Sequence, residues 1–229
     1  MSLRLYDLAG ADPKLRFSPY CWRTKFALAH KGLAVETIPW RFTEKEFIAF
    51  SGQERVPVLI DGEKTISDSW AIACYLDDAY PDRPSLFGSA AARSPTRFLN
   101  AWADTVLNPG IIPFVLLDIF GKIDPKDRDY FRSNREQRFG MTLEAYGAER
   151  EKRLPAFRQS LTPLRTMLAA QPFLAGERPA YADYIVFGSF QWARCISSFA
   201  LIAPDDPVFA WRERMLDAFD GMPRRALAA

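Results

Sequence analysis

The chain opens with short apolar runs separated by an amphipathic stretch. Leu3–Leu8 and Val35–Trp40 have the alternation typical of strands. Between them, Trp22 and Phe26 begin a series of apolar side chains repeated every three or four positions, which indicates a helix. Two strands joined by one helix pair in parallel with a right-handed crossover, so the pattern predicts a βαβ unit.

A second set of elements follows within the same part of the chain. Thr43–Glu46 has the form of a capping box and predicts a short helix. Val56–Ile60 is followed by Asp61-Gly62 and a second β-branched run, which predicts an antiparallel hairpin. Ser67–Ser69 then supplies capping side chains for a helix that ends at Pro81. The predicted order is βαβ-α-ββ-α.

The remainder of the chain has a different pattern. Residues 83–94 are rich in Pro, Ser, Ala and Gly and predict a linker. Beyond them, the apolar side chains recur at helical spacing. The prolines and glycine at 109–113 predict a bend or break in the helix over residues 95–119. We therefore expect an α/β plus all-α protein, with domains at 1–82 and 95–229. The helix register within 121–155 stays open.

Composition excludes several classes of protein. The chain has 229 residues, a hydrophobic fraction of 48% and a net charge of +2, which is typical of a globular protein and weighs against nucleic-acid or anionic-membrane binding. We see no signal-peptide pattern and no long apolar run, so we expect a cytoplasmic protein without a membrane span. Three separated cysteines and one histidine, His30, predict neither a disulfide framework nor a metal site.

Ser18 is the strongest candidate for a chemical role in the first half of the chain. Proline is tolerated in the first turn of a helix, so Pro19 makes Ser18 a candidate N-cap. A hydroxyl at a helix N-terminus that follows a strand can also hold an anion. Taken alone, Ser18 is more simply interpreted as a plain N-cap.

The order of elements is thioredoxin-like, and with the helical domain it resembles the cytosolic glutathione transferases. The resemblance is carried by Ser18-Pro19-Tyr20, Val56-Pro57, Asp68-Ser69, and residues 173–176 with Ala182-Asp183. More narrowly, the segments 18–25, 54–58 and 68–76 are similar to the bacterial lignin β-etherase transferases and their fungal serine-type, FuA-like relatives.

The resemblance implies glutathione as a co-substrate, with no metal. A thiol with its ordinary pKa of about 8.5 is mostly protonated at neutral pH, whereas the thiolate is the nucleophile. The Ser18 hydroxyl would donate to the glutathione sulfur and, with the helix N-terminus, lower the pKa of the thiol by about one or two units.

The same resemblance assigns the residues that would hold the tripeptide. Val56, before a cis Pro57, would pair its main chain with the cysteinyl backbone of glutathione. Ser69 would hold the γ-glutamyl carboxylate and Asp68 the γ-glutamyl ammonium. Arg55 and Lys45 are candidates for the glycyl carboxylate.

The second substrate would meet the sulfur between the domains. We expect an apolar, aryl-containing electrophile, and in the β-etherase version of the reaction an aryloxide is displaced at a carbon polarised by a carbonyl. The candidate pocket walls are Tyr20, Trp102, Phe114, Phe120 and Tyr146. The resemblance also implies a homodimer.

Two other functions stay open at this point. Ser18-Pro19-Tyr20-Cys21 resembles the Cys-Pro-Tyr-Cys motif of glutaredoxins with its first cysteine replaced, which would make Cys21 the thiol of a glutathione-dependent thiol–disulfide oxidoreductase. The fold could also serve as a non-catalytic carrier of apolar ligands.

Overall fold

The computed structural model describes residues 3–229, so residues 1–2 of the predicted N-terminal domain lie outside it. The first part of the chain contains, in order, β1 (Leu3–Leu8), α1 (Pro19–His30), β2 (Val35–Trp40), the 3₁₀ helix η1 (Lys45–Ser51), β3 (Val58–Asp61), β4 (Lys64–Ser67) and α2 (Ser69–Ala79). This order confirms the predicted thioredoxin-like arrangement.

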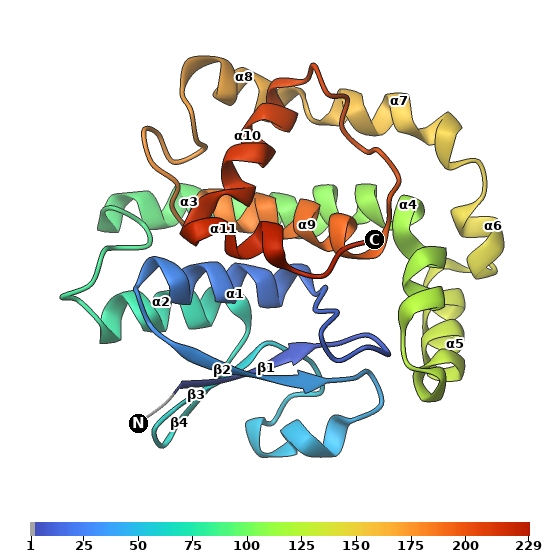
Figure 1. Cartoon of the computed structure of the whole chain (residues 1–229), viewed down its shortest axis with the longest axis horizontal. Coiled ribbons are helices and arrows are strands. Elements are labelled where there is room, and N and C mark those ends of the chain that lie inside the picture. Colours follow the sequence, from blue (N-terminus) through green and yellow to red (C-terminus); the bar gives the residue numbers. More distant parts are fainter. Residues whose placement is uncertain (1–2) are drawn as a thin grey trace.

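The four strands form one mixed sheet in the order β2-β1-β3-β4. β1 runs parallel to β2, which is the βαβ unit, and antiparallel to β3, where Tyr6 is paired with Val58. β3 and β4 form the hairpin, with Val58 paired with Ser67. Figure 1 shows α1 and α2 on one side of the sheet and η1 on the other.

The second part of the chain is helical, as predicted. It contains α3 (Ala90–Trp102), η2 (Ala103–Leu107), α4 (Asn108–Lys122), η3 (Pro125–Asp127), α5 (Arg128–Phe139), α6 (Leu143–Gly147), α7 (Arg150–Ser160), α8 (Thr162–Ala170), α9 (Tyr181–Ile196), α10 (Pro207–Leu216) and α11 (Ala218–Arg225). α5, α6 and α7 occupy the stretch in which no register could be predicted.

α9 lies at the centre of the molecule, packed along α1 (Figure 1). Fourteen of its sixteen residues are buried, and the buried apolar side chains of both parts of the chain form one continuous core. Gly188 permits the close approach of the two helices, because a Cβ there would lie 2.7 Å from the Pro19 carbonyl oxygen and 3.2 Å from Arg23 Cγ. The helical part therefore directly supports the start of α1.

α3, η2 and α4 form one uninterrupted helical run over Ala90–Lys122. Of the bend or break predicted at 109–113, a break was wrong, because α4 continues through Pro113; the π-helical turn η2 lies just before Asn108 and Pro109. By length and composition this run could cross a membrane, since its most apolar window has a mean hydropathy of 1.4. A buried core helix passes the same test, and 44% of this window is buried.

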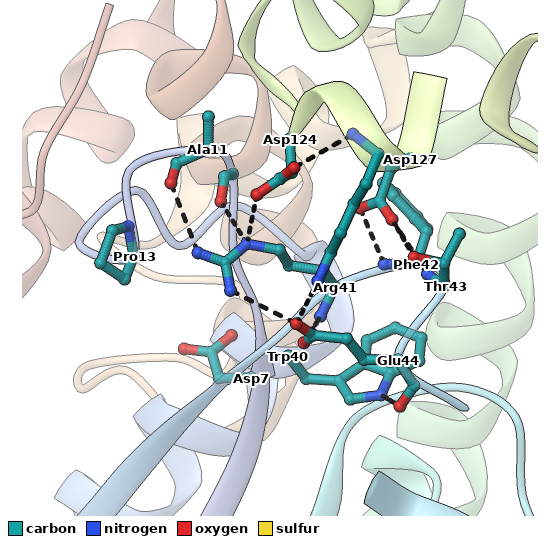
Figure 2. A network of polar contacts seen from close by, with 12 residues as sticks. Asp7, Ala11, Pro13, Trp40, Arg41, Phe42, Thr43, Glu44, Asp124 and Asp127 are labelled. Atoms are coloured by element: carbon teal, nitrogen blue, oxygen red, sulfur yellow. Dashed lines mark hydrogen bonds and ion pairs between the residues drawn. The ribbon is translucent and has the colours of Figure 1, made fainter. Parts of the chain in front are cut away.

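The predicted capping box at Thr43–Glu46 was wrong. The Thr43 hydroxyl does not cap the following helix but donates to Asp127 Oδ1 at 2.6 Å, and the Glu44 carboxylate accepts from the Arg41 main-chain N–H and pairs with Lys126 (Figure 2). The helix that follows is 3₁₀, and its Phe47 and Phe50 side chains are more than half exposed. The Thr43 hydroxyl therefore bonds to the helical part of the chain instead of capping the helix next to it.

Candidate active site

Ser18 is the N-cap of α1, as predicted. Its backbone is extended, Pro19 occupies the first turn, and its Oγ accepts from the Cys21 main-chain N–H at 3.3 Å. The residue is 3% exposed and lies at a cavity wall. Because the hydroxyl oxygen is the acceptor in this contact, the hydroxyl proton stays available to a group in the cavity.

The sheet brings three of the predicted site segments to one end. The Phe17 N–H donates to the Leu8 carbonyl at 3.4 Å, which fixes Ser18 beside the end of β1. Continuing the β1–β3 register by two residues places Val56 opposite Leu8. The β3–β4 register pairs Val58 with Ser67, so Pro57 and Asp68 follow at the same end of the hairpin.

The Val56–Pro57 peptide bond is cis. Pro57 is buried and Val56 is half-buried at the cavity wall. Within residues 3–229, no hydrogen bond engages the main-chain N–H or carbonyl of Val56. A donor and an acceptor on one residue beside a cavity can pair with an extended peptide, as a neighbouring strand would.

Asp68 and Ser69 form the start of α2. Asp68 has a positive φ of 75°, and its Oδ1 accepts from the N–H groups of Trp70 and Ala71 at 3.0 Å each, so Asp68 is the N-cap. Ser69 is buried, and its carbonyl accepts from the Tyr181 hydroxyl of α9 at 2.7 Å. Neither residue lines the cavity beside Ser18.

A cavity of about 680 Å³ lies between the sheet end and the helical part. Among the predicted residues it is lined by Ser18, Tyr20, Arg55, Val56 and Tyr146. Tyr146 is stacked on Phe139, with ring centroids 3.9 Å apart. Lys45 lies outside the lining and pairs with Glu54 at 2.7 Å.

The three other predicted pocket aromatics lie elsewhere. Phe114 is buried in the core, where its ring packs against Phe157 and Phe199. Phe120 packs on Phe131 and Arg132, and Trp102 lines a separate apolar cavity of about 540 Å³ between α3 and α8. Apolar spacing along a helix identified aromatic faces, but it could not tell which face turned toward the sheet.

Sequence reasoning missed a polar cluster beneath the cavity. Arg23 is fully buried, pairs with Asp104 at 2.8 Å and donates to Asn100 Oδ1 at 3.1 Å. Its guanidinium lies over the Tyr20 ring, 4.9 Å from the centroid. Asn108, also buried, completes this side of the cavity. No local motif marked these residues, because they come together only when α1 packs against α3 and α4.

The opposite wall is formed by the loop after β2 and by α5. Phe42 and Arg135 line the cavity there, with the Arg135 guanidinium 5.9 Å from the Phe42 ring centroid. Asp127 fixes this wall by accepting from the main-chain N–H groups of Phe42 and Thr43, at 3.1 Å each (Figure 2). Arg138 adds a second guanidinium to the α5 side. The α5 wall of the cavity therefore carries two guanidinium groups.

Cys21 and His30 are in unreactive surroundings. Cys21 is fully buried, and its Sγ lies 4.0 Å from the Tyr6 carbonyl oxygen. Burial raises the pKa of the Cys21 thiol, and the Asp7 carboxylate raises it further, which weighs against a thiolate at this position. His30 links Tyr184 and the Ser85 carbonyl, at 2.7 and 3.1 Å. Across residues 3–229, no group of three or more potential metal-binding side chains is present.

Comparison with known proteins gives a consistent result. The family model of the glutathione S-transferase N-terminal domain matches residues 13–84 of the sequence. The family model of the C-terminal domain matches residues 96–199. Glutathione S-transferase Z2 of Arabidopsis thaliana is 33% identical over 109 residues, or 45% of this chain and 47% of that protein. The chain thus spans about half the length of this curated relative.

Two solved fungal structures match over nearly the whole chain. A glutathione S-transferase of Ceriporiopsis subvermispora in complex with glutathione is 25% identical, with a TM-score of 0.78 over 97% of this chain and 99% of that one. Glutathione transferase GSTFuA3 of Phanerochaete chrysosporium is 25% identical, with a TM-score of 0.78 over 96% and 92%. Together, the two domain models cover more than half of the chain in the expected order. The chain belongs to the glutathione S-transferase family.

Proposed function

We propose that this protein is a glutathione transferase in which glutathione thiolate, held beside Ser18, attacks an apolar, aryl-containing electrophile. One observation carries the proposal: the Ser18 hydroxyl, at the N-terminus of α1, shares a cavity with Val56, whose main chain has no hydrogen bond within residues 3–229. The likeness to a fungal transferase solved with glutathione supports the choice of thiol.

The Ser18 hydroxyl acts on the charge of the sulfur and is not itself the nucleophile. A donated hydrogen bond and the positive end of α1 both favour the thiolate over the thiol. The thiol proton goes to solvent, the sulfur forms a bond to carbon, and the leaving group departs with the electron pair of the broken bond. Each unit by which the pKa of the thiol falls corresponds to about 1.4 kcal/mol.

The tripeptide would lie across the sheet end. Val56 pairs with its cysteinyl backbone, and the start of α2 at Asp68 and Ser69 receives the γ-glutamyl end. Arg55, at the cavity wall, is the better candidate for the glycyl carboxylate. Lys45 already pairs with Glu54 and would have to exchange partners to bind glutathione.

The electrophile would occupy the part of the cavity next to Tyr20 and Tyr146. We propose a serine-type enzyme related to the FuA and β-etherase transferases, for which β-aryl ether ketones are the substrates to test first. The likeness to GSTFuA3 supports this subclass. We further propose, on family grounds, that the enzyme is a cytoplasmic homodimer.

The decisive variant is Ser18→Ala. The helix N-terminus stays in this variant, so we expect the loss of the hydroxyl alone to raise the pKa of bound glutathione by about one unit and to slow conjugation at least about tenfold. The pKa is measured by the ultraviolet absorbance of the thiolate. Ser89→Ala is the matched control, because Ser89 is also an N-cap, accepting from the Ala92 N–H at 3.3 Å, but lies at α3 away from the cavity.

An unchanged thiol titration in Ser18→Ala would remove Ser18 from the mechanism. Saturable binding of a hydrophobic dye without conjugation of any electrophile would favour a carrier instead. Reduction of a glutathione mixed disulfide that is lost in Cys21→Ser would favour the oxidoreductase.

A further inference from the structure

Asn108 is a buried amide whose polar atoms have no hydrogen bond among the described residues. It is the first residue of α4, directly after the π-helical turn η2, and only 8% of it is exposed. Neither Nδ2 nor Oδ1 has a hydrogen-bond partner among residues 3–229. Buried polar atoms in native proteins are normally paired, so an orphaned amide requires an explanation.

The position of Asn108 supplies that explanation. Its side chain lines the same cavity as Ser18, so a molecule bound there can reach both. Nearby, Asp104 pairs with Arg23 and accepts from the Asn100 amide at 2.9 Å, and neither of these two side chains bonds to the Asn108 amide, although Asp104 Oδ1 and Arg23 Nη2 also lack a hydrogen bond among residues 3–229. The unpaired amide therefore points to a group on a ligand.

Tyr20 adds a second polar group to this wall. It lies in the first turn of α1, its ring is stacked under the Arg23 guanidinium, and it lines the cavity. Burial raises the pKa of the Tyr20 phenol, and the Asp104 carboxylate raises it further, while Arg23 and the adjacent Asn108 amide oppose this rise without reversing it, so the phenol stays protonated and can donate. The Asn108 amide group carries two further N–H donors.

We propose that Asn108 and Tyr20 form an oxygen-binding subsite that selects electrophiles with a carbonyl next to the reacting carbon. Both residues offer donors, and a neutral carbonyl oxygen is an acceptor that needs no countercharge. Hydrogen bonds to that oxygen draw electrons from the adjacent carbon and favour attack by the thiolate. The inference rests on the proposed transferase function, because the sulfur must lie beside Ser18.

The test uses two unreactive glutathione conjugates, so that binding is measured without turnover. S-phenacylglutathione carries a carbonyl beside the carbon attached to sulfur, and S-(2-phenylethyl)glutathione has a methylene in its place. We expect the wild-type protein to bind the phenacyl conjugate about tenfold more tightly, measured by isothermal titration calorimetry. Asn108→Leu should reduce this ratio to near one, and Tyr20→Phe should lower it severalfold.

Asn134→Leu is the matched control, because Asn134 is an exposed amide that lines the same cavity from α5. It should leave the ratio unchanged. Asn108→Leu has nearly the same volume as the wild type and removes two unpaired buried atoms, so its melting temperature should be equal or higher. A purely structural Asn108 would instead give a lower melting temperature and an unchanged ratio.

The outcomes separate this inference from the proposed function. If both conjugates bind equally to the wild type, or if the ratio survives in Asn108→Leu and Tyr20→Phe, the subsite is refuted while glutathione binding stands. If neither conjugate nor glutathione itself binds, the proposed function fails and the subsite fails with it.

Discussion

Asp127 is the fully buried carboxylate in the contact between the loop after β2 and the helical part. It accepts from the Phe42 N–H and the Thr43 N–H at 3.1 Å each and from the Thr43 hydroxyl at 2.6 Å (Figure 2). Asp127 is fully buried and lies in η3. We predict that Asp127→Ala separates this loop from α5 and destabilises the whole fold.

The magnitude follows from what the variant leaves behind. Each hydrogen bond to a charged group contributes about 1.5–3 kcal/mol, so three would give about 4.5–9 kcal/mol if they were additive. Removal of the carboxylate also removes the free-energy cost of burying it, which is several kcal/mol and offsets part of this loss. We therefore expect a loss of about 3–4 kcal/mol in the free energy of unfolding.

Urea denaturation followed by circular dichroism and fluorescence measures this loss. A chain of this size loses about 2–4 °C in melting temperature per kcal/mol, so a decrease of about 6–16 °C should accompany it. Thr43→Val removes one of the three donors and should have about one third of the effect. Asp129→Ala is the control, because Asp129 is exposed, and exposed changes usually stay within about 0.5 kcal/mol.

A loss below about 1 kcal/mol in Asp127→Ala would refute the reasoning, since two main-chain N–H groups would then have lost a buried partner at no cost. An equal loss in Asp129→Ala would refute it as well, because the effect would then be one of net charge alone.

Three further predictions address the core, the pH dependence and the assembly. Gly188→Ala should lower the free energy of unfolding by about 1–3 kcal/mol in urea denaturation, because its Cβ would lie 2.7 Å from the Pro19 carbonyl oxygen. Gly121→Ala, which has open space around it, should stabilise the fold slightly. Equal effects of the two substitutions would contradict the packing argument. Tyr75 and Tyr80 donate to Asp61 Oδ2 at 2.8 and 2.5 Å, and burial, followed by this hydrogen bond, raises the pKa of each phenol to about 12. The folded state thus holds both protons more tightly than the unfolded chain, so this stabilisation is complete below about pH 10 and is lost as the pH rises to about 12. The free energy of unfolding of wild type should fall over that range more steeply than that of the Tyr75→Phe/Tyr80→Phe variant, and parallel curves would count against the assignment. Phe98, 74% exposed on α3 beside an apolar cavity, should lie in the proposed dimer interface. Sedimentation velocity should show Phe98→Glu as a monomer and Met141→Glu as a dimer, whereas a dimeric Phe98→Glu would place the interface elsewhere.

The features that sequence predicted correctly are those determined within a few residues. The hairpin follows from Asp61-Gly62, and the N-cap role of Ser18 follows from Pro19 directly after it. The cis bond at Val56–Pro57 was instead expected from the resemblance, because the local pattern alone is also compatible with a trans proline.

The errors share a different physical cause. Thr43 had the right neighbours for a capping box, but a buried carboxylate 84 residues away was the stronger partner. Phe114 has the spacing of a helical face, yet that face turns toward Phe157 and Phe199 and away from Ser18. Asn108 showed no signal at all, because an amide becomes unpaired only when the tertiary structure excludes water from it.

The positions of Ser18 and Cys21 explain why the proposed chemistry would use a thiol supplied from outside. The two side chains lie within one turn at the start of α1, but only Ser18 lines the cavity. Cys21 is buried, and both its burial and Asp7 oppose ionisation of its thiol, so it cannot compete with a bound thiol for an electrophile. A hydroxyl at Ser18 can donate a hydrogen bond without ionising near neutral pH. In the proposed mechanism the positive end of α1 would therefore stabilise the charge of the glutathione sulfur, and the nucleophile would leave the protein as part of each product.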